Sequence, residues 1–378
     1  MSHRLIRIGS TLGAGVLAMS LAACGGTSDA GSSSSSGSSD ASTAPSGDSS
    51  ASSQTLSGSI AGAGATSQES AMEAWKAGFA SVQPDVTVSY DAVGSGAGIT
   101  QFTDGQVLWA GSDAPLDGDD LTAAEARCGS PAWDLPVYIS PVAVIFNLDG
   151  VSSLNLDAAT IAGIFNGTIT TWNDPAIAAT NPGVTLPSTA ITPVHRSDES
   201  GTTQNFTDYL HDAAPDVWTD KAAKAWPISG GESANGTSGV VQAVTAGQGT
   251  IGYADASQAG SLGTVALETA SGDFVSFSNE TAAKAADTAT TVEGRDASDI
   301  ALAVNRVPDT ADSYPLVLIS YSIVCSTYEN QSDADLVKAF VGYQASQEGQ
   351  ELASQAAGSA PLSDALRQKV QAALDAVR

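Results

Sequence analysis

The chain has 378 residues, which suggests one large or two medium domains, and 42% of them are hydrophobic, which fits a soluble α/β protein. Its 41 acidic and 14 basic residues give a formal net charge of -27. This charge argues against nucleic acid as a partner, because so acidic a protein repels a phosphate backbone.

The first residues are typical of a targeting signal. Arg4 and Arg7 precede the apolar run IGSTLGAGVLAMSLAA, which is too short to span a bilayer comfortably and ends in LAAC. The combination resembles the bacterial lipobox, where the chain is cut before a Cys that is then acylated. We therefore predict a signal peptide over residues 1–23 and export to the outer face of the cell membrane, with a lipid anchor on Cys24. The alternative is an ordinary cleaved signal with a chance Cys.

A Ser- and Gly-rich segment follows. Residues 25–55 contain no aromatic and no large aliphatic side chain, so they cannot bury enough apolar surface to offset the entropy of ordering. We predict that residues 24–55 are a flexible tether, about 30 Å from end to end by random-coil scaling.

The body from residue 56 onward alternates strand and helix signals. Met72, Trp75 and Phe79 recur at helical spacing, and Thr66 and Glu69 have capping-box spacing before them. The apolar runs PVAVIFNL and PLVLISYSIVC predict buried parallel strands, and two apolar stripes predict C-terminal helices. Repeated β-then-α order predicts an α/β fold with a mostly parallel sheet flanked by helices.

Two cysteines remain beyond Cys24. In an exported protein Cys128 and Cys325 are candidates for a disulfide, and the alternative is a pair of free buried thiols.

Four short segments share small, hydroxyl-bearing residues. GAGATS (62–67), GSGAG (94–98) and SGTT (200–203) precede predicted helices, and GSDAP (111–115) places Asp113 at the end of a strand. Helix N-termini leave N–H groups unpaired, glycine lets an anion approach the backbone, and hydroxyls add donors. Three such ends aimed at one point would bind a compact oxyanion. Nucleotide binding is disfavoured, because the chain lacks both a P-loop and a clean G-x-G-x-x-G motif.

Together the motifs resemble a known family. GAGAT, YDAVGSGAG, GSDAPL, NGTITTWNDPAI, HRSDESGTT and GTIGYADA match, in order, the periplasmic phosphate-binding protein of the bacterial phosphate-specific ABC importer. The resemblance covers the body from Leu56 to the C-terminus. It implies a binding protein and not an enzyme, with no cofactor and no metal. Its implied partners are inorganic phosphate and the membrane permease of the importer, to which a monomer would deliver phosphate.

The resemblance also implies the site. Hydroxyl and amide donors, the Arg196–Asp198 pair and the acceptor Asp113 would contact phosphate. The full implied set is Thr66, Ser67, Ser95, Asp113, Arg196, Asp198, Ser200, Gly201 and Thr202. The sequence departs from the common pattern at Glu199, where many relatives carry Gly, and Glu199 is expected to face solvent at the rim.

Asp113 and Arg196 each have a simpler alternative. Asp113 could cap a turn, and Arg196 could form a surface ion pair with Asp198 or Glu199. In the binding role, the carboxylate of Asp113 accepts a hydrogen bond from the P–OH group that hydrogen phosphate still carries and that sulfate at neutral pH lacks. The guanidinium of Arg196 offers a fixed fork of donors that suits an oxyanion.

The implied fold is a type II periplasmic binding protein with two lobes. Lobe I would contain residues 56–137 and 316–378 and lobe II residues 138–315, joined by a two-strand hinge near 135–138 and 314–318. Two other functions stay open: a phosphoesterase that binds phosphate as product, and a binder of another oxyanion such as sulfate or molybdate. A triad of His195, Asp198 and Ser200 is disfavoured, because no G-x-S-x-G elbow is present.

Overall fold

The computed structural model describes residues 55–378. The predicted signal peptide, Cys24 and all of the predicted tether except its last residue lie outside this range. Within it, no helix combines the length and apolar character needed to cross a bilayer.

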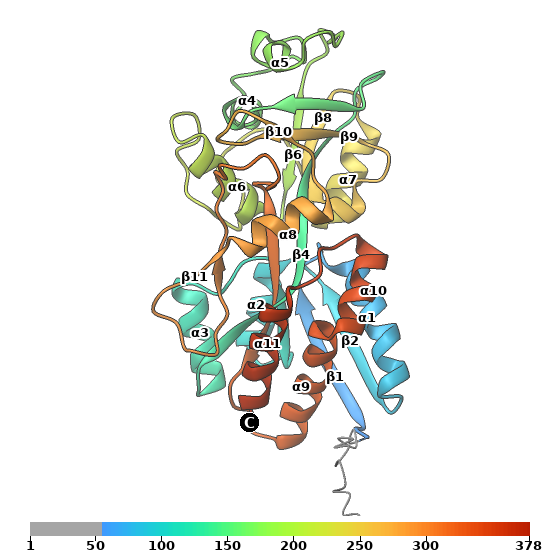
Figure 1. Cartoon of the computed structure of the whole chain (residues 1–378), viewed down its shortest axis with the longest axis vertical. Coiled ribbons are helices and arrows are strands. Elements are labelled where there is room, and N and C mark those ends of the chain that lie inside the picture. The colour runs from blue at the N-terminus through green and yellow to red at the C-terminus, as the bar shows by residue number, and fades with distance from the viewer. Residues whose placement is uncertain (1–54) are drawn as a thin grey trace, which may run out of the picture. The chain divides into compact units, whose positions relative to one another are not determined.

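A mixed β-sheet organises the described part of the chain (Figure 1). Its hydrogen-bonded order is β2-β1-β3-β13-β4-β8-β6-β7, and β9 pairs with β4 and carries β5 and β10. The strands are β1 Gly58–Gly64, β2 Val86–Ala92, β3 Trp109–Ser112, β4 Ala132–Phe146, β5 Ser153–Leu156, β6 Thr192–Arg196, β7 Glu232–Ala234, β8 Thr250–Asp255, β9 Gly263–Glu268, β10 Phe274–Val275, β13 Val317–Cys325, and the separate hairpin β11 Thr290–Thr291 and β12 Leu302–Ala303. Parallel pairs lie toward both ends of the order, and antiparallel pairs join β3, β13, β4 and β8 in the middle.

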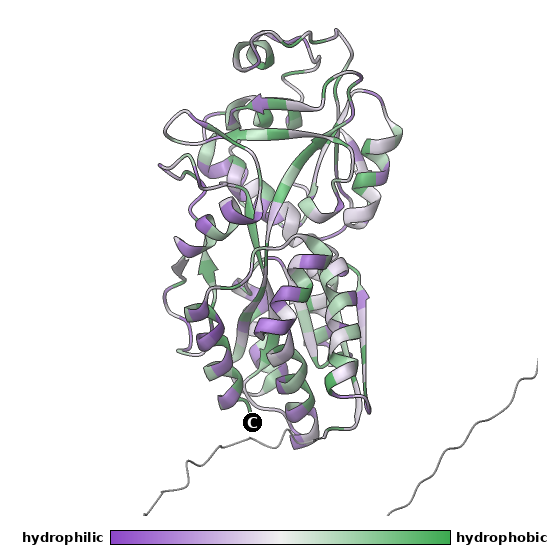
Figure 2. Cartoon of the chain, turned by 45° about the vertical axis from the view of Figure 1, so that its right-hand side comes forward, coloured by the Kyte–Doolittle hydropathy of each residue, from purple (hydrophilic) through white to green (hydrophobic). Residues whose placement is uncertain are grey.

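Helices follow the strands, as the β-then-α pattern predicts. They are α1 Glu69–Val82, α2 Ser95–Thr103, α3 Gly118–Cys128, α4 Ala158–Phe165, α5 Pro175–Thr180, α6 Gly201–Ala213, α7 Gly236–Ala246, α8 Asn279–Asp287, α9 Gln331–Ala345, α10 Gln347–Ala357 and α11 Asp364–Ala376, with a 3₁₀ turn η1 at Ala256–Gln258. The predicted face of α1 is buried, with Trp75 fully enclosed. Figure 2 shows hydrophobic residues concentrated along the central strands, while the helices also carry hydrophilic stretches. The predicted α/β class is confirmed.

The two long apolar strands differ from their predicted direction. β4 and β13 are buried along their whole lengths, as predicted, but they run antiparallel to each other. Burial on both faces fixes the apolar pattern of a strand and leaves its direction open, so the prediction of parallel strands was wrong here.

β4 is also longer than its apolar run, because it passes through two prolines. Proline has no N–H to donate, which normally excludes it from a central strand. The β13–β4 register shifts beside Pro136, and after Pro141 the strand changes partner from β13 to β8. Each proline therefore lies where the ladder is already interrupted.

The predicted lobe boundaries fall on these same strands. Figure 1 shows β4 running from the group of α1, α2, α9, α10 and α11 to the group of α4, α6 and α7. Contacts also cross the predicted boundary: the amide of Asp134 donates to Asp299 (2.9 Å), and its carbonyl accepts from the amide of Ile300 (3.0 Å). The division into two lobes stays a prediction.

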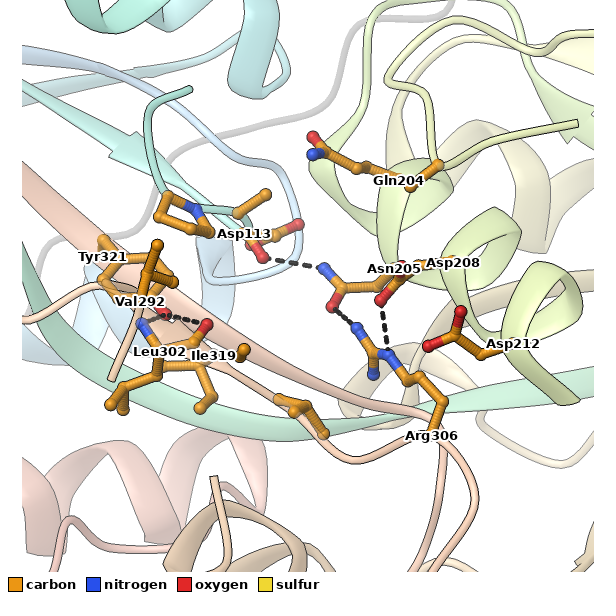
Figure 3. A pocket seen from close by; sticks show the side chains of 15 residues that line it. Asp113, Gln204, Asn205, Asp208, Asp212, Val292, Leu302, Arg306, Ile319 and Tyr321 are labelled. Atoms are coloured by element: carbon orange, nitrogen blue, oxygen red, sulfur yellow. Dashed lines mark hydrogen bonds and ion pairs between the residues drawn. The ribbon is translucent and has the colours of Figure 1, made fainter. Parts of the chain in front are cut away.

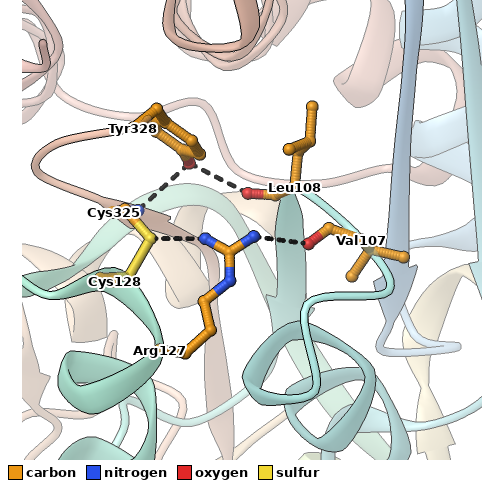
Figure 4. The surroundings of a disulfide bond; sticks show 6 residues. All are labelled: Val107, Leu108, Arg127, Cys128, Cys325 and Tyr328. Carbon is orange, nitrogen blue, oxygen red and sulfur yellow. Dashed lines mark hydrogen bonds between the residues drawn. A yellow bond between two sulfur atoms is a disulfide. The ribbon is translucent and has the colours of Figure 1, made fainter. Parts of the chain in front are cut away.

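The Cys128–Cys325 disulfide ties the end of α3 to the end of β13, and the predicted pairing is confirmed (Figure 4). Arg127 stands beside it: Nη1 donates to the sulfur of Cys325 (2.8 Å) and Nη2 to the carbonyl of Val107 (3.2 Å). The bond joins residues 197 positions apart. It therefore fixes α3 on the sheet.

Replacing both cysteines by serine should lower the free energy of unfolding by about 3–5 kcal/mol, because the unfolded chain regains the freedom of a long closed loop. Guanidinium unfolding of the oxidised protein and of the variant measures this, and reduced wild-type protein should match the variant. Equal midpoints for the oxidised protein and the variant would contradict the stabilising role.

Candidate functional site

Asp113 is the centre of a buried polar cluster. It follows β3, and the residue is 2% exposed. The hydroxyl of Ser67 donates to Oδ1 (2.5 Å), and the hydroxyl of Thr202 donates to Oδ2 (2.9 Å). Burial raises the pKa of Asp113, and the hydrogen bonds from Ser67, Thr202 and Ser320 oppose that shift. Asp113 thus joins two of the predicted segments and is not a simple turn cap.

Ser95 connects the same segments from another side. It is the first residue of α2, and its hydroxyl accepts from the amide of Gly201 (3.1 Å) and the amide of Asp113 (3.3 Å). A side chain at Gly201 has no room, because a Cβ there would lie 2.6 Å from the Ser95 hydroxyl oxygen and 2.8 Å from the Asp113 Cβ. The glycine of the SGTT segment is therefore needed for close packing.

α6 begins as predicted. Ser200 is its N-cap, and the hydroxyl of Ser200 accepts from the amide of Thr203 (3.2 Å). Helix α6 has an ordinary cap, and Gly201 and Thr202 of its first turn face Ser95 and Asp113. The positive end of the helix macrodipole thus points at the cluster.

Arg196 is buried and held by Asp198. Its Nε donates to Asp198 Oδ1 (2.8 Å), its Nη2 contacts Oδ2, and only 3% of the residue is exposed. Burial alone would raise the pKa of Asp198, but the hydrogen bonds and charge of Arg196, with the amide of Gly236, lower it. The alternative of a surface ion pair does not fit this burial, since the guanidinium is shielded from water.

Thr66 occupies a different position from the one its spacing predicts. The N-cap of α1 is Gln68, with no side-chain cap bond, so the predicted capping box is wrong. Instead the hydroxyl of Thr66 contacts the hydroxyl of Thr237 (2.8 Å) and accepts from the amide of Thr237 (3.1 Å). A tertiary partner displaces the local cap, and Thr66 joins the cluster through it.

The start of α7 is the part of the cluster that the sequence analysis missed. Gly236 donates its amide to Asp198 Oδ1 (3.0 Å), and Thr237 bonds to Thr66. The signal was available, because the segment NGTSG (235–239) has the small, hydroxyl-bearing composition of the other four. It follows the short strand β7, which has no apolar run to mark it.

Glu199 is exposed, as expected for a residue at the rim. Its carbonyl accepts from the amide of Gly96 (3.0 Å), and a Cβ on Gly96 would lie 2.4 Å from the Glu199 Cβ. The glycine at position 96 therefore makes room for the glutamate at position 199.

A cavity of about 260 Å³ adjoins the cluster, and Asp113 is the only predicted site residue among those that line it. Asn205 of α6 reaches across it and donates to the carbonyl of Asp113 (2.7 Å), and Asn205 Oδ1 accepts from Arg306 (Figure 3). Arg306 also donates to the carbonyl of Val317 (2.7 Å). This network is a second link between the Asp113 loop and α6.

His195, Asp198 and Ser200 are not arranged as a catalytic triad. The ring of His195 stacks on Trp226 with centroids 4.8 Å apart, and its Nδ1 lies 2.9 Å from the carbonyl of Arg196. The Ser200 hydroxyl is occupied as the cap of α6, so the three residues form no triad. Over residues 55–378 no group of His, Cys, Asp and Glu side chains is placed to hold a metal ion.

Comparison with known proteins places the chain among binding proteins. A family model described as a PBP superfamily domain matches residues 49–348. The phosphate-binding protein PstS 3 of Mycobacterium tuberculosis (strain H37Rv) is 43% identical over 288 residues, 75% of this chain and 77% of that protein. PstS 3 of Mycobacterium leprae is 39% identical over 327 residues, 84% of this chain and 87% of that protein.

Solved structures agree on the fold. A high-affinity periplasmic phosphate-binding protein (PfluDING), solved with phosphate bound, superposes with a TM-score of 0.69 at 24% identity over 83% of this chain and 93% of that one. A phosphate-binding protein from Stenotrophomonas maltophilia superposes with a TM-score of 0.62 at 21% identity, over 84% of this chain and 94% of that one.

Proposed function

This chain belongs to the PBP superfamily and, within it, to the phosphate-binding proteins of phosphate ABC importers, and from that membership we propose that it binds inorganic phosphate for delivery to the importer's permease. The observation that carries the proposal is the buried convergence of Ser95, Asp113 and Thr202 from separate segments of the chain, with buried Arg196 beside Gly94 at the start of α2. The relatives that are 43% and 39% identical are named phosphate-binding proteins. The cluster offers the hydrogen-bond donors and the acceptor that phosphate requires.

The proposed roles follow from the donors and acceptors. Arg196 supplies the one buried cation of the cluster, and Asp198 holds its guanidinium in a fixed orientation. Hydroxyls and amides at the starts of α2 and α6 add neutral donors. The carboxylate of Asp113 accepts a hydrogen bond from the protonated oxygen of phosphate. The ligand contacts proposed for this set are those of Thr66, Ser67, Ser95, Asp113, Arg196, Ser200, Gly201 and Thr202, with Asp198 as the partner of Arg196.

Global acidity does not prevent anion binding here. Most of the acidic side chains in residues 55–378 are exposed, and salt screens the long-range effect of exposed charges within about 10 Å. Local dipoles and the guanidinium of Arg196 act at contact distance inside a buried cluster, where electrostatic interactions are stronger than in water.

The proposal includes two lobes that close on phosphate. Thr66, Ser95 and Asp113 belong to the predicted lobe I, and the segment 196–202 belongs to the predicted lobe II. Contacts such as Thr202 to Asp113 join the two sets. A ligand held from both sides favours the closed arrangement by its differential affinity. An exported monomer anchored through Cys24 would bring phosphate to the permease at the membrane.

Isothermal titration tests the function. Phosphate should bind tightly, sulfate and molybdate much more weakly, and incubation with a generic phosphate ester should give no turnover. Tight sulfate or molybdate binding would favour another oxyanion as ligand, and ester turnover would favour a phosphoesterase. Absence of phosphate binding would contradict the proposal.

A further inference from the structure

A salt bridge beside the cluster joins the two predicted lobes. Lys224, in the loop between α6 and β7, contacts the carboxylate of Asp120 in the first turn of α3. The side chain of Lys224 is 13% exposed and that of Asp120 is 41% exposed. Lys224 lies in predicted lobe II and Asp120 in predicted lobe I, so the pair can form only when these elements meet.

The Lys224 end is fastened to the proposed phosphate site. Its carbonyl accepts from the amide of Ser200, the N-cap of α6 (3.0 Å). The neighbouring amide of Ala223 donates to the hydroxyl of Thr207 within α6 (3.0 Å). The loop therefore lies along α6, and the position of Lys224 is coupled to the start of that helix through these hydrogen bonds.

The Asp120 end is fastened to the sheet. Helix α3 ends at Cys128, which is bonded to Cys325 of β13, and Arg127 anchors the same turn to Val107. The loop before α3 carries Asp113. It is fixed by Leu116, whose amide donates to both carboxylate oxygens of Asp134 in β4 (3.1 Å each). Asp120 thus lies on a helix that is fixed to the sheet and that directly follows the loop carrying Asp113.

We propose that Lys224 and Asp120 form a latch that holds the lobes closed around bound phosphate and sets the rate at which phosphate leaves. The inference rests on the proposed function and on two-lobe closure. Neither side chain touches the ligand, so both are positioning residues. A contact present only in the closed form slows opening and leaves the encounter of phosphate with the open form unchanged.

The test measures release of radiolabelled phosphate from the full-length protein after a chase with unlabelled phosphate. Lys224→Met and Asp120→Asn should each release phosphate about fivefold faster than wild type. This ratio corresponds to about 1 kcal/mol of interaction energy, the upper end of the range for a partly exposed ion pair. The double variant should release at the same rate as either single variant, because each change removes the same interaction. Association rates should stay at the wild-type value.

The chain offers matched controls. Lys221→Met changes an exposed lysine on the same loop, and Asp119→Asn changes an exposed carboxylate in the same turn of α3. Both should release phosphate at the wild-type rate. The melting temperature without phosphate should also be unchanged in Lys224→Met, whereas the added stability from phosphate should be smaller. A lower melting temperature of the phosphate-free variant would indicate a merely structural pair and overturn the latch.

Failure of the latch can be told apart from failure of the function. Normal phosphate capture with wild-type release in both single variants overturns the latch alone. A release rate in the double variant that is raised by the product of the two single-variant factors also overturns the latch, since it would show that the two side chains act separately. A wild-type protein that captures no labelled phosphate overturns the proposed function and the latch with it.

Discussion

Replacing Arg196 by alanine should weaken phosphate binding by about 100- to 1,000-fold, or ~3–4 kcal/mol, while the fold stays intact. The variant loses the only cation of the cluster and leaves the carboxylate of Asp198 facing the ligand. Asp198 retains the amide of Gly236 as a partner, so the loss falls on binding more than on stability. Isothermal titration with phosphate and a thermal unfolding curve measure the two effects separately.

Two further variants show what Arg196 contributes. Arg196→Lys keeps the charge and loses the planar fork, so its phosphate affinity should lie between that of wild type and that of the alanine variant. Arg367→Ala removes an arginine from α11, where it pairs with exposed Asp364, and should bind phosphate normally. Near-normal affinity of Arg196→Ala would refute the proposed site.

Replacing Asp113 by asparagine should narrow the preference for phosphate over sulfate by about 100-fold or more. In wild type, sulfate at neutral pH brings no proton and meets the carboxylate of Asp113 as an unpaired like charge. Asparagine removes that charge and keeps a similar shape, so sulfate gains affinity while phosphate loses a charged acceptor and keeps only a neutral amide oxygen. Titrations of both ions give the ratio, with Asp119→Asn as the control for a lost charge. An unchanged ratio in Asp113→Asn counts against the proposed role.

The same reasoning gives a pH dependence. Burial raises the pKa of Asp113 above its ordinary value, so protonation begins at a higher pH than for an exposed aspartate. A protonated Asp113 can donate to sulfate, so sulfate affinity should rise as the pH falls, starting at a higher pH than an exposed aspartate would give. Asp113→Asn should abolish this rise. A sulfate affinity that is flat with pH in wild type would contradict the assignment.

The polar cluster could be predicted because its members lie at local landmarks. Ser95, Ser200 and Thr202 lie at helix starts, and Asp113 follows a strand, so sequence spacing alone placed them correctly. Their convergence rested on the family resemblance, because no local pattern says which helix starts meet. Thr237 was missed for a related reason: β7, the strand before it, is too short to leave an apolar signal.

Other features depend on tertiary partners that the sequence does not display. Thr66 does not cap α1 as predicted, because its hydroxyl is hydrogen-bonded to Thr237 instead. The length of β4 was hidden by Pro136 and Pro141, which interrupt a strand pattern yet coincide with a register shift and a change of partner. The antiparallel direction of β4 and β13 leaves no trace in composition. Local chemistry was therefore more predictable than long-range pairing.

A crystal structure of the protein grown with phosphate tests the central claim most directly. We expect one phosphate in contact with the Arg196 guanidinium, the Thr202 hydroxyl and the Asp113 carboxylate, between the starts of α2 and α6. Phosphate bound elsewhere, with these three side chains bonded only to one another, would contradict the account.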